Sequence, residues 1–340
     1  MAFDVKVAPL VVLIKASYNI VMANGATSEL IRWKNRFLTY IEVEKNKSLL
    51  TRRNYEHYLS VFIAVTKLQK PSDITLDDIR DFRLWLNRQT SKRGTSLKKS
   101  TQNYYLIALR SFLKYLARQD VKTLAAEKIE LAKTAERQVD FLEGPDLERF
   151  LSAPLAQVRR DIVAYRDKAI LELLFSTGLR VSELANLKKD NVNLQKDEFT
   201  VRGKGDKLRI VFLSPSAKLW LGEYLKRRKD MAPYLFVRND RASKKSADQK
   251  PITSRSIQRL VEHYAKAAGI TKRVTPHTLR HSYATDLLMN GADIRSVQAM
   301  LGHASIQTTQ IYTHITNPKL REIFGKYHGK KRDKNDRRSS

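Results

Sequence analysis

Apolar residues recur along the chain at two spacings, and these predict helical segments and one pair of strands. Within residues 26–118 the apolar positions repeat every three or four residues in four segments, which is typical of amphipathic helices. Two aspartates just after Thr75 favour the start of the third helix, and Ser100 is the expected N-cap of the fourth. Tyr104 and Tyr115 are expected on the core face of that fourth helix. The expected core positions of the first three helices are Leu30, Trp33, Phe37, Ile41, Tyr55, Tyr58, Leu59, Phe62, Ile79, Phe82 and Leu86.

The region after residue 141 combines helices with one β-hairpin. Residues 199–212 alternate apolar and polar side chains on both sides of the glycine-containing turn 203–206, which indicates two antiparallel strands. A strongly apolar helix is expected over residues 166–175 and is ended near Gly178. Further helices are expected to start at Gly144, Ser216, Ser254, Pro276 and Ala292. The predicted fold class is therefore mainly α with a small β-hairpin, in an α+β arrangement.

Segments without apolar periodicity predict the domain boundaries. Residues 121–138 are rich in Ala, Lys and Glu, which favours a partly helical linker. The last fifteen residues carry seven Lys or Arg against two Asp, which predicts a disordered basic tail. We expect an N-terminal extension at 1–25, a helical domain at 26–120, a linker at 121–140, a second domain at 141–328 and the basic tail at 329–340.

No segment has the pattern of a membrane span or a secretory signal. The most apolar stretch near the N-terminus, residues 8–14, is seven residues long, whereas a spanning helix needs about 20 apolar residues. Asp4 is unfavourable in a secretory signal. The chain has no cysteine, which excludes disulfides and thiolate metal sites and fits a reducing compartment. We therefore expect a cytoplasmic protein.

The charge balance points to a polyanionic partner. The 64 Lys and Arg residues against 35 Asp and Glu residues give a formal net charge of +29. A field of this sign attracts nucleic acid and accelerates encounter with it. A ribosomal-type basic protein and a membrane-surface binder have similar charge. The 42% hydrophobic content is too high for a disordered basic tail, and 340 residues suffice for two domains with their own cores.

Three short motifs in the second region carry the candidate chemistry. Arg180 lies in Thr-Gly-Leu-Arg-Val-Ser-Glu-Leu, and His277 and Arg280 lie three residues apart in Thr-Pro-His-Thr-Leu-Arg-His-Ser. His303 follows Leu-Gly, and Tyr312 comes nine residues later. Arginine forks hold the non-bridging oxygens of a phosphodiester while a phenol oxygen attacks the phosphorus. Taken singly, each residue has an ordinary explanation: a helix-capping arginine, a chance helical pair, or a half-buried tyrosine.

The order and spacing of these residues resemble the tyrosine recombinases (the lambda-integrase family), and most closely the Xer type. The resemblance extends over about residues 26–328. It implies a two-domain DNA clamp, with a helical, SAM-like core-binding domain followed by a catalytic domain. It also implies chemistry that needs no metal ion, no other cofactor and no ATP. The catalytic set that it implies is Arg180, Lys204, His277, Arg280, His303 and the nucleophile Tyr312.

The resemblance also gives the neighbouring residues their roles. Glu183, three residues after Arg180, is expected to orient that arginine. Lys204 lies in the glycine-flanked hairpin turn, where the family has its general acid for the departing 5′ oxygen. Lys207 and Arg209 compete for that role but look more like phosphate contacts. His281 follows Arg280 directly and is interpreted as structural, on a different helical face.

Two further groups of residues have alternative interpretations. Lys92, Arg93, Lys98 and Lys99 form a basic run that is either a solvated face or a set of DNA phosphate contacts. Residues 318–327 form an amphipathic helix with Leu320, Ile323 and Phe324 apolar. This helix packs on its own domain or, as in the family, is exchanged with a neighbouring protomer of a tetramer on two DNA duplexes.

The expected function is that of a site-specific DNA recombinase, which forms a 3′-phosphotyrosyl intermediate and a Holliday junction. A Xer-type role in chromosome dimer resolution and a role as integrase of a phage, a transposon or another mobile element share every residue used above. A paralogous recombinase or a division-linked activator is left open. A type IB topoisomerase shares the chemistry but differs in its motifs, and a non-catalytic DNA-binding protein is the alternative from another class.

Overall fold

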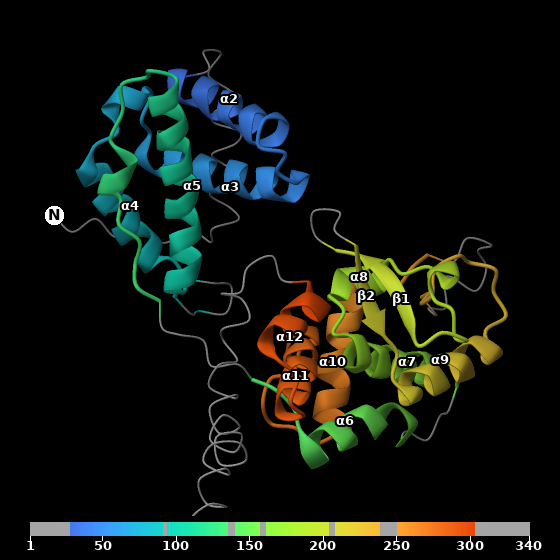
Figure 1. The fold of residues 1–340 in the computed structure, drawn as a ribbon. Helices are drawn as coiled ribbons and strands as arrows, with labels where there is room; N and C mark the ends of the chain where they lie inside the picture. Colours follow the sequence, from blue (N-terminus) through green and yellow to red (C-terminus); the bar gives the residue numbers. More distant parts are fainter. Residues whose placement is uncertain are drawn as a thin grey trace, which may run out of the picture. The chain divides into compact units, whose positions relative to one another are not determined.

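The computed structural model of the protein describes residues 28–90, 94, 96–134, 140–156, 161–203, 208–238 and 250–302 (Figure 1). Within these residues the protein is mainly helical and has one two-stranded antiparallel sheet, which confirms the predicted fold class. No helix among them is long and apolar enough to cross a membrane. The chain divides into two compact units, residues 1–136 and 137–340, and each unit is described by itself.

The first unit is built from the four predicted helices. They are α2 (Glu29–Val43), α3 (Leu49–Thr66), α4 (Leu76–Arg88) and α5 (Lys99–Arg118), with the short 3₁₀ turns η1 (Pro71–Asp73) and η2 (Ala126–Lys128). Side-chain caps explain where three of them begin. The hydroxyls of Ser28 and Ser48 accept from backbone N–H groups of α2 and α3, and Thr75 forms a capping box with Asp78 at α4.

The fourth helix differs from its prediction in where it begins and in which tyrosine faces the core. Helix α5 begins at Lys99, with Lys98 in the N-cap position and without a side-chain cap, so the prediction of Ser100 as N-cap is wrong. Tyr105 is buried and its hydroxyl lies 3.2 Å from Nε2 of His57, whereas Tyr104 is 52% exposed. The contact with His57 on α3 and the contacts of α5 with α2, α3 and α4 place Tyr105 inward and leave its neighbour outside.

The first part of the predicted linker belongs to the first unit. Ala126 and Ile129 are buried in the same core as Phe37 and Phe112. The boundary between the two units falls between residues 136 and 137. Two apolar side chains thus anchor a segment of low apolar content, and the division between the units lies inside the predicted linker, near its end.

The second unit is arranged around one central helix. Its elements are α6 (Gly144–Ala156), α7 (Ile162–Thr177), α8 (Val181–Ala185), η3 (Lys189–Asn191), β1 (Glu198–Arg202), β2 (Leu208–Phe212), α9 (Pro215–Arg227), α10 (Ser254–Ala267), α11 (Pro276–Met289) and α12 (Ile294–Leu301). Helix α7 contacts α6, α9, α11 and β2 (Figure 1). It is buried around most of its circumference, as its strongly apolar sequence predicts. Its buried charges are paired, with Lys168 Nζ 2.6 Å from Glu172 Oε1.

The face of the hairpin that packs against the domain includes a charged residue, while apolar residues of β2 are exposed. Val201 lies opposite Arg209 and Phe199 opposite Val211, and these four residues form the inner face of the sheet. The apolar residues of β2 at alternate positions, Leu208, Ile210 and Phe212, are 64%, 50% and 44% exposed. A charged side chain, that of Arg209, therefore points inward from β2.

Candidate active site

Two glycines end the helices that surround the site. Gly178 ends α7 with a φ of 58°, and its N–H donates to the carbonyl of Leu174. Gly302 ends α12 with a φ of 63°. Any Cβ at Gly178 would lie 2.6 Å from Cδ1 of Tyr283, and one at Gly302 would lie 2.9 Å from Cδ of Arg209. Both positions therefore require glycine, because of the left-handed backbone and because of close neighbours.

Arg280 joins the ends of these two helices. Its side chain starts from α11 and is buried. Nη1 donates to the carbonyl of Gly178, and Nη2 donates to the carbonyl of Leu301 at 2.5 Å. Carbonyls at helix C-termini lack helical partners and carry the negative end of the helix dipole. They are therefore suitable partners for a guanidinium that is shielded from water.

Arg180 contacts the same end of α12, at the residue that follows Leu301. It occupies the N-cap position of α8. Its Nη1 donates to Oε1 of Glu183 at 2.9 Å, and its Nη2 donates to the carbonyl of Gly302 at 3.2 Å. The side chain remains 28% exposed. The structure thus brings Arg180 and Arg280 onto consecutive carbonyls, those of Gly302 and Leu301, and leaves part of the Arg180 guanidinium accessible.

Glu183 is shared between two arginines. It orients Arg180, as expected, and accepts the Arg180 backbone N–H at 2.8 Å as well. Arg209 donates to both of its oxygens, at 3.0 and 2.7 Å. Burial alone would raise the pKa of Glu183, but the hydrogen bonds from Arg209 and Arg180 lower it to about 2. Because Arg209 has 7% of its side chain exposed and is paired at both terminal nitrogens, its predicted role as a phosphate contact does not agree with the structure.

Two histidines lie on the same side of α11 near these arginines. His277 is exposed, yet desolvation by the surrounding protein, followed by the charges of Arg280 and Arg180, lowers its pKa. The pKa of His281 is lowered to about 4 by burial, with smaller contributions from His277 and Arg280. His281 follows Arg280 directly and therefore lies on a different helical face from that arginine, while its spacing of four residues from His277 brings the two histidines to one side of the helix.

The remaining predicted site residues are divided between the surface and the undescribed segments. Lys98 and Lys99 are exposed at the N-terminus of α5 in the first unit. The described part of the chain does not include Lys92, Arg93, Lys204, Lys207, His303, Tyr312, Leu320, Ile323 or Phe324. Two of these candidates are close in sequence to described elements. Lys204 lies between the end of β1 at Arg202 and the start of β2 at Leu208, and His303 lies two residues after the end of α12 at Leu301.

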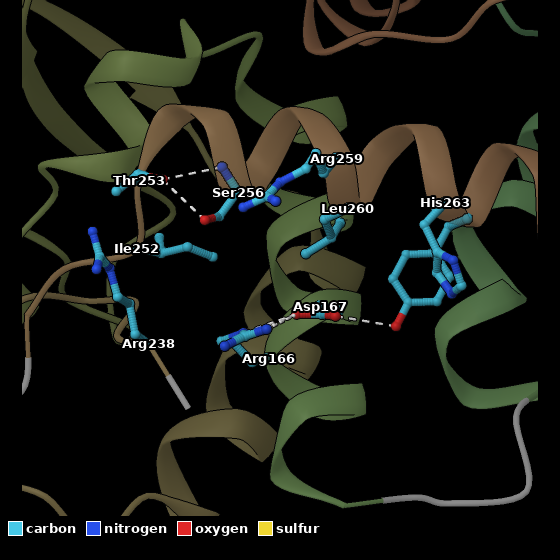
Figure 2. Close-up of a pocket in the computed structure, with 10 residues that line it drawn as sticks. Arg166, Asp167, Arg238, Ile252, Thr253, Ser256, Arg259, Leu260 and His263 are labelled. Carbon is cyan, nitrogen blue, oxygen red and sulfur yellow. Dashed lines mark hydrogen bonds and ion pairs between the residues drawn. The ribbon is translucent and has the colours of Figure 1, made fainter. Parts of the chain in front are cut away.

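A separate cavity of about 560 Å³ lies between α10 and the first half of α7 (Figure 2). It is lined by basic side chains such as Arg238 and Arg259 and by the buried pair of Arg166 and Asp167. The hydroxyl of Tyr264 donates to Asp167 at 3.1 Å. Gly178, the C-cap of α7, follows Asp167 by eleven residues, which corresponds to about 16 Å of helix. The cavity is therefore distinct from the arginine site.

The arginine site is suited to a tetrahedral oxyanion. Arg180 and Arg280 are planar donors that match the oxygens of a phosphodiester, and their positions are fixed by carbonyls and a carboxylate. His277 lies near both guanidiniums and favours its neutral form. The fold and the site therefore define a mainly helical domain with a cationic cluster of arginines suited to a phosphodiester.

The chain belongs to the phage integrase family, the tyrosine recombinases. The family model described as "Phage integrase family" matches residues 140–318, and the model described as "Phage integrase, N-terminal SAM-like domain" matches residues 35–120. A tyrosine recombinase XerD from Listeria monocytogenes is 37% identical over 297 residues, which cover 86% of this chain and 97% of the relative. A tyrosine recombinase XerC from Thermodesulfovibrio yellowstonii is 38% identical over 303 residues, which cover 86% of this chain and 94% of the relative.

Solved structures support the same fold. The XerH site-specific recombinase bound to a palindromic difH substrate, a post-cleavage complex, matches with a TM-score of 0.66 at 22% identity, covering 92% of this chain and 94% of that one. A lambda integrase dimer bound to a COC′ core site matches with a TM-score of 0.62 at 18% identity, covering 83% and 94%. Tyrosine recombinases cleave and rejoin DNA strands, so the chain is a DNA recombination enzyme, and the XerD and XerC relatives favour the Xer type over a mobile-element integrase.

The shared carboxylate predicts a specific pH dependence of stability. Because the folded-state pKa of Glu183 is about 2, below its ordinary value, the ionised pair stabilises the fold above about pH 4.5, and this is lost as the pH falls toward 2. Glu183→Gln should remove this part of the acid sensitivity, which is up to about 3 kcal/mol. Urea unfolding of the parent and the variant at pH 6 and pH 3 measures it. An equal loss of stability in both proteins between these pH values would contradict the assignment.

Proposed function

We propose that this chain cuts and rejoins double-stranded DNA at specific sites through a 3′-phosphotyrosyl link to Tyr312. The observation that supports the proposal most is the convergence of Arg180 and Arg280 on the end of α12. Gly302, whose carbonyl accepts from Arg180, directly precedes His303 in the third motif. The two guanidiniums would hold the non-bridging oxygens of the scissile phosphate and stabilise the charge that develops in the five-coordinate transition state.

The other catalytic candidates move protons in this proposal. A phenol has a pKa of about 10, so Tyr312 needs help to lose its proton at neutral pH. Nearby guanidiniums favour the phenolate, and His277 or His303 assists the transfer or holds a phosphate oxygen. His277 suits this role because desolvation, with the charges of Arg280 and Arg180, lowers its pKa and favours the neutral imidazole. Lys204 would protonate the departing 5′ oxygen.

The proposed reaction is an exchange between two DNA sites. Four protomers hold two duplexes, and the tyrosines of two protomers cut one strand of each. The free 5′ hydroxyls attack the partner links and give a Holliday junction, and the second pair of protomers then repeats the exchange. Exchange of the helix that carries Leu320, Ile323 and Phe324 would link the protomers.

The proposed cellular role is based on the similarity to the Xer relatives. Relatives named XerD and XerC share 34–38% identity with this chain, and we assign it the corresponding role in resolving chromosome dimers in the cytoplasm, at the nucleoid. A paralogous recombinase or a division-linked activator is a partner consistent with this role. Additional phosphate contacts are assigned to Lys92, Arg93, Lys98, Lys99 and Lys207.

The nucleophile is tested by covalent capture. A DNA substrate that carries a recombination site and a nick next to the cleavage position should trap a covalent protein–DNA adduct. Tyr312→Phe should abolish the adduct and leave the gel-shift affinity almost unchanged, because it removes one oxygen and no charge. Tyr327→Phe is the matched control and should retain the adduct. An adduct that persists undiminished in Tyr312→Phe would exclude this tyrosine.

The role of the planar Arg280 guanidinium is tested by replacing it with lysine. Arg280→Lys should reduce strand cleavage about 10²-fold or more, because an ammonium cannot donate in two directions to the carbonyls of Gly178 and Leu301 and still face the phosphate. DNA affinity should change little, since Arg280 is one of many cationic contacts. Arg273→Lys, at an exposed position of the same unit, is the control. Full cleavage activity in Arg280→Lys would refute the argument.

The general acid is tested by changing the leaving group. Lys204→Ala should cleave normal DNA poorly, because the departing 5′ oxygen requires a proton. A substrate with a bridging 5′ sulfur at the scissile position needs no proton and should restore cleavage by this variant. Single-turnover cleavage of both substrates by Lys204→Ala and Lys207→Ala gives the comparison. Rescue confined to Lys207→Ala would transfer the role to Lys207.

A further inference from the structure

Arg209 is a buried cation on the inner face of the hairpin. Strand alternation points it into the domain beside Val201 and Val211, although both neighbours in sequence, Leu208 and Ile210, are apolar and exposed. A buried guanidinium is costly unless it is paired and hydrogen-bonded. Both terminal nitrogens donate to Glu183, one to each carboxylate oxygen. This two-point contact fixes the orientation of the carboxylate.

Glu183 in turn holds Arg180 by two hydrogen bonds. Oε1 accepts from Nη1 of Arg180 and Oε2 accepts from its backbone N–H. Each carboxylate oxygen therefore receives one donor from Arg209 and one from Arg180. The carboxylate lies between two cations, and its single negative charge cannot cancel both.

Arg209 also borders the second partner of Arg180. Its stem lies against Gly302, where an added Cβ would come within 2.9 Å of Cδ and 3.5 Å of Nη1 of Arg209. The carbonyl of Gly302 accepts from Nη2 of Arg180. Arg209 thus touches both groups that orient Arg180, and it does so from β2, the strand that begins four residues after Lys204 in sequence.

From these contacts we infer that Arg209 is a positioning residue for the cleavage reaction: it orients and neutralises Glu183, so that Arg180 keeps its geometry and its positive charge for the phosphate. This inference rests on the proposed function. Without Arg209, Glu183 would face Arg180 alone, and the pair would be neutral where an anion must bind. Removing one partner of a buried ion pair leaves the other charge uncompensated.

The inference gives a double-variant test. Arg209→Ala should slow single-turnover cleavage of the nicked substrate about 10²-fold, with gel-shift affinity within about threefold of the parent. Glu183→Gln alone should cost less, since Arg180 keeps its charge. The combined variant Arg209→Ala/Glu183→Gln should cleave at least about tenfold faster than Arg209→Ala, because it removes the uncompensated carboxylate. A structural contribution alone would make the combined variant as slow as or slower than Arg209→Ala.

Controls separate this inference from the proposed function and from misfolding. If the parent forms no adduct that depends on Tyr312, the proposed function fails and Arg209 is not at issue. Arg209→Lys, which keeps the charge but cannot contact both oxygens, should fall between the parent and Arg209→Ala, and it carries the test if Arg209→Ala does not fold. The partly exposed pair of Arg227 and Glu223 on α9 provides the matched control, and its two variants and their combination should cleave like the parent.

Two outcomes would overturn the inference. One is a combined variant that cleaves no faster than Arg209→Ala or, where Arg209→Ala does not fold, an Arg209→Lys variant that cleaves like the parent. The other is a loss of cleavage by Arg209→Ala that follows an equal loss of DNA affinity, with the salt dependence of binding reduced by about one counterion. The second result would return Arg209 to the role of a direct phosphate contact.

Discussion

The catalytic unit depends on the two hydrogen bonds of the Arg280 guanidinium. They connect α11 to the ends of α7 and α12, at Gly178 and Leu301, which lie 102 and 21 residues away in sequence. Each carbonyl is one that its own helix leaves without a partner, and each helix end carries a partial negative charge. One buried cation thus satisfies two groups that would otherwise lose their hydrogen bonds to water. The residue expected to bind phosphate is at the same time the residue that assembles the site.

The two glycines make this arrangement possible. The turn at Gly178 ends α7 and directs the chain into α8, whose N-cap position is Arg180. The turn at Gly302 presents its carbonyl to Arg180 and leaves space for the stem of Arg209. The short motif Thr-Gly-Leu-Arg therefore combines a helix end with the side chain of Arg180. Arg180 meets Gly302 because the ends of α7 and α12 converge.

The helices, the hairpin and the arginine motifs could be predicted because their signals are local. Periodicity, caps such as Thr75 with Asp78, and glycine-containing turns are all contained in a few consecutive residues. The direction of the hairpin faces could not be predicted in this way. Alternation alone groups Leu208, Ile210 and Phe212 as an apolar set and leaves Arg209 on the other face, which favours a contact with solvent or phosphate for the arginine.

The structure reverses this assignment through residues that are distant in sequence. Phe199 and Val201 on β1 define the inner face by their register with β2, and Glu183 on α8 supplies the partner that allows Arg209 to be buried. The burial of Ile129 and the inward position of Tyr105 have the same origin, because tertiary contacts of the first unit decide them. Local pattern is informative about which elements form, and much less about which face of a short element the rest of the domain will cover.

The charges of the site follow from the same network. Among the residues that the structure describes, the guanidiniums of Arg180, Arg209 and Arg280 and the carboxylate of Glu183 leave two positive charges in excess. A phosphodiester carries one negative charge, and the five-coordinate species formed by attack of a phenolate carries two. In the proposed reaction, an excess of positive charge therefore stabilises the transition state more than the bound substrate, which is the condition for catalysis by differential binding. The lowered pKa of His277, with burial as its main cause and the charges of Arg280 and Arg180 as further ones, keeps the imidazole neutral and available to exchange a proton.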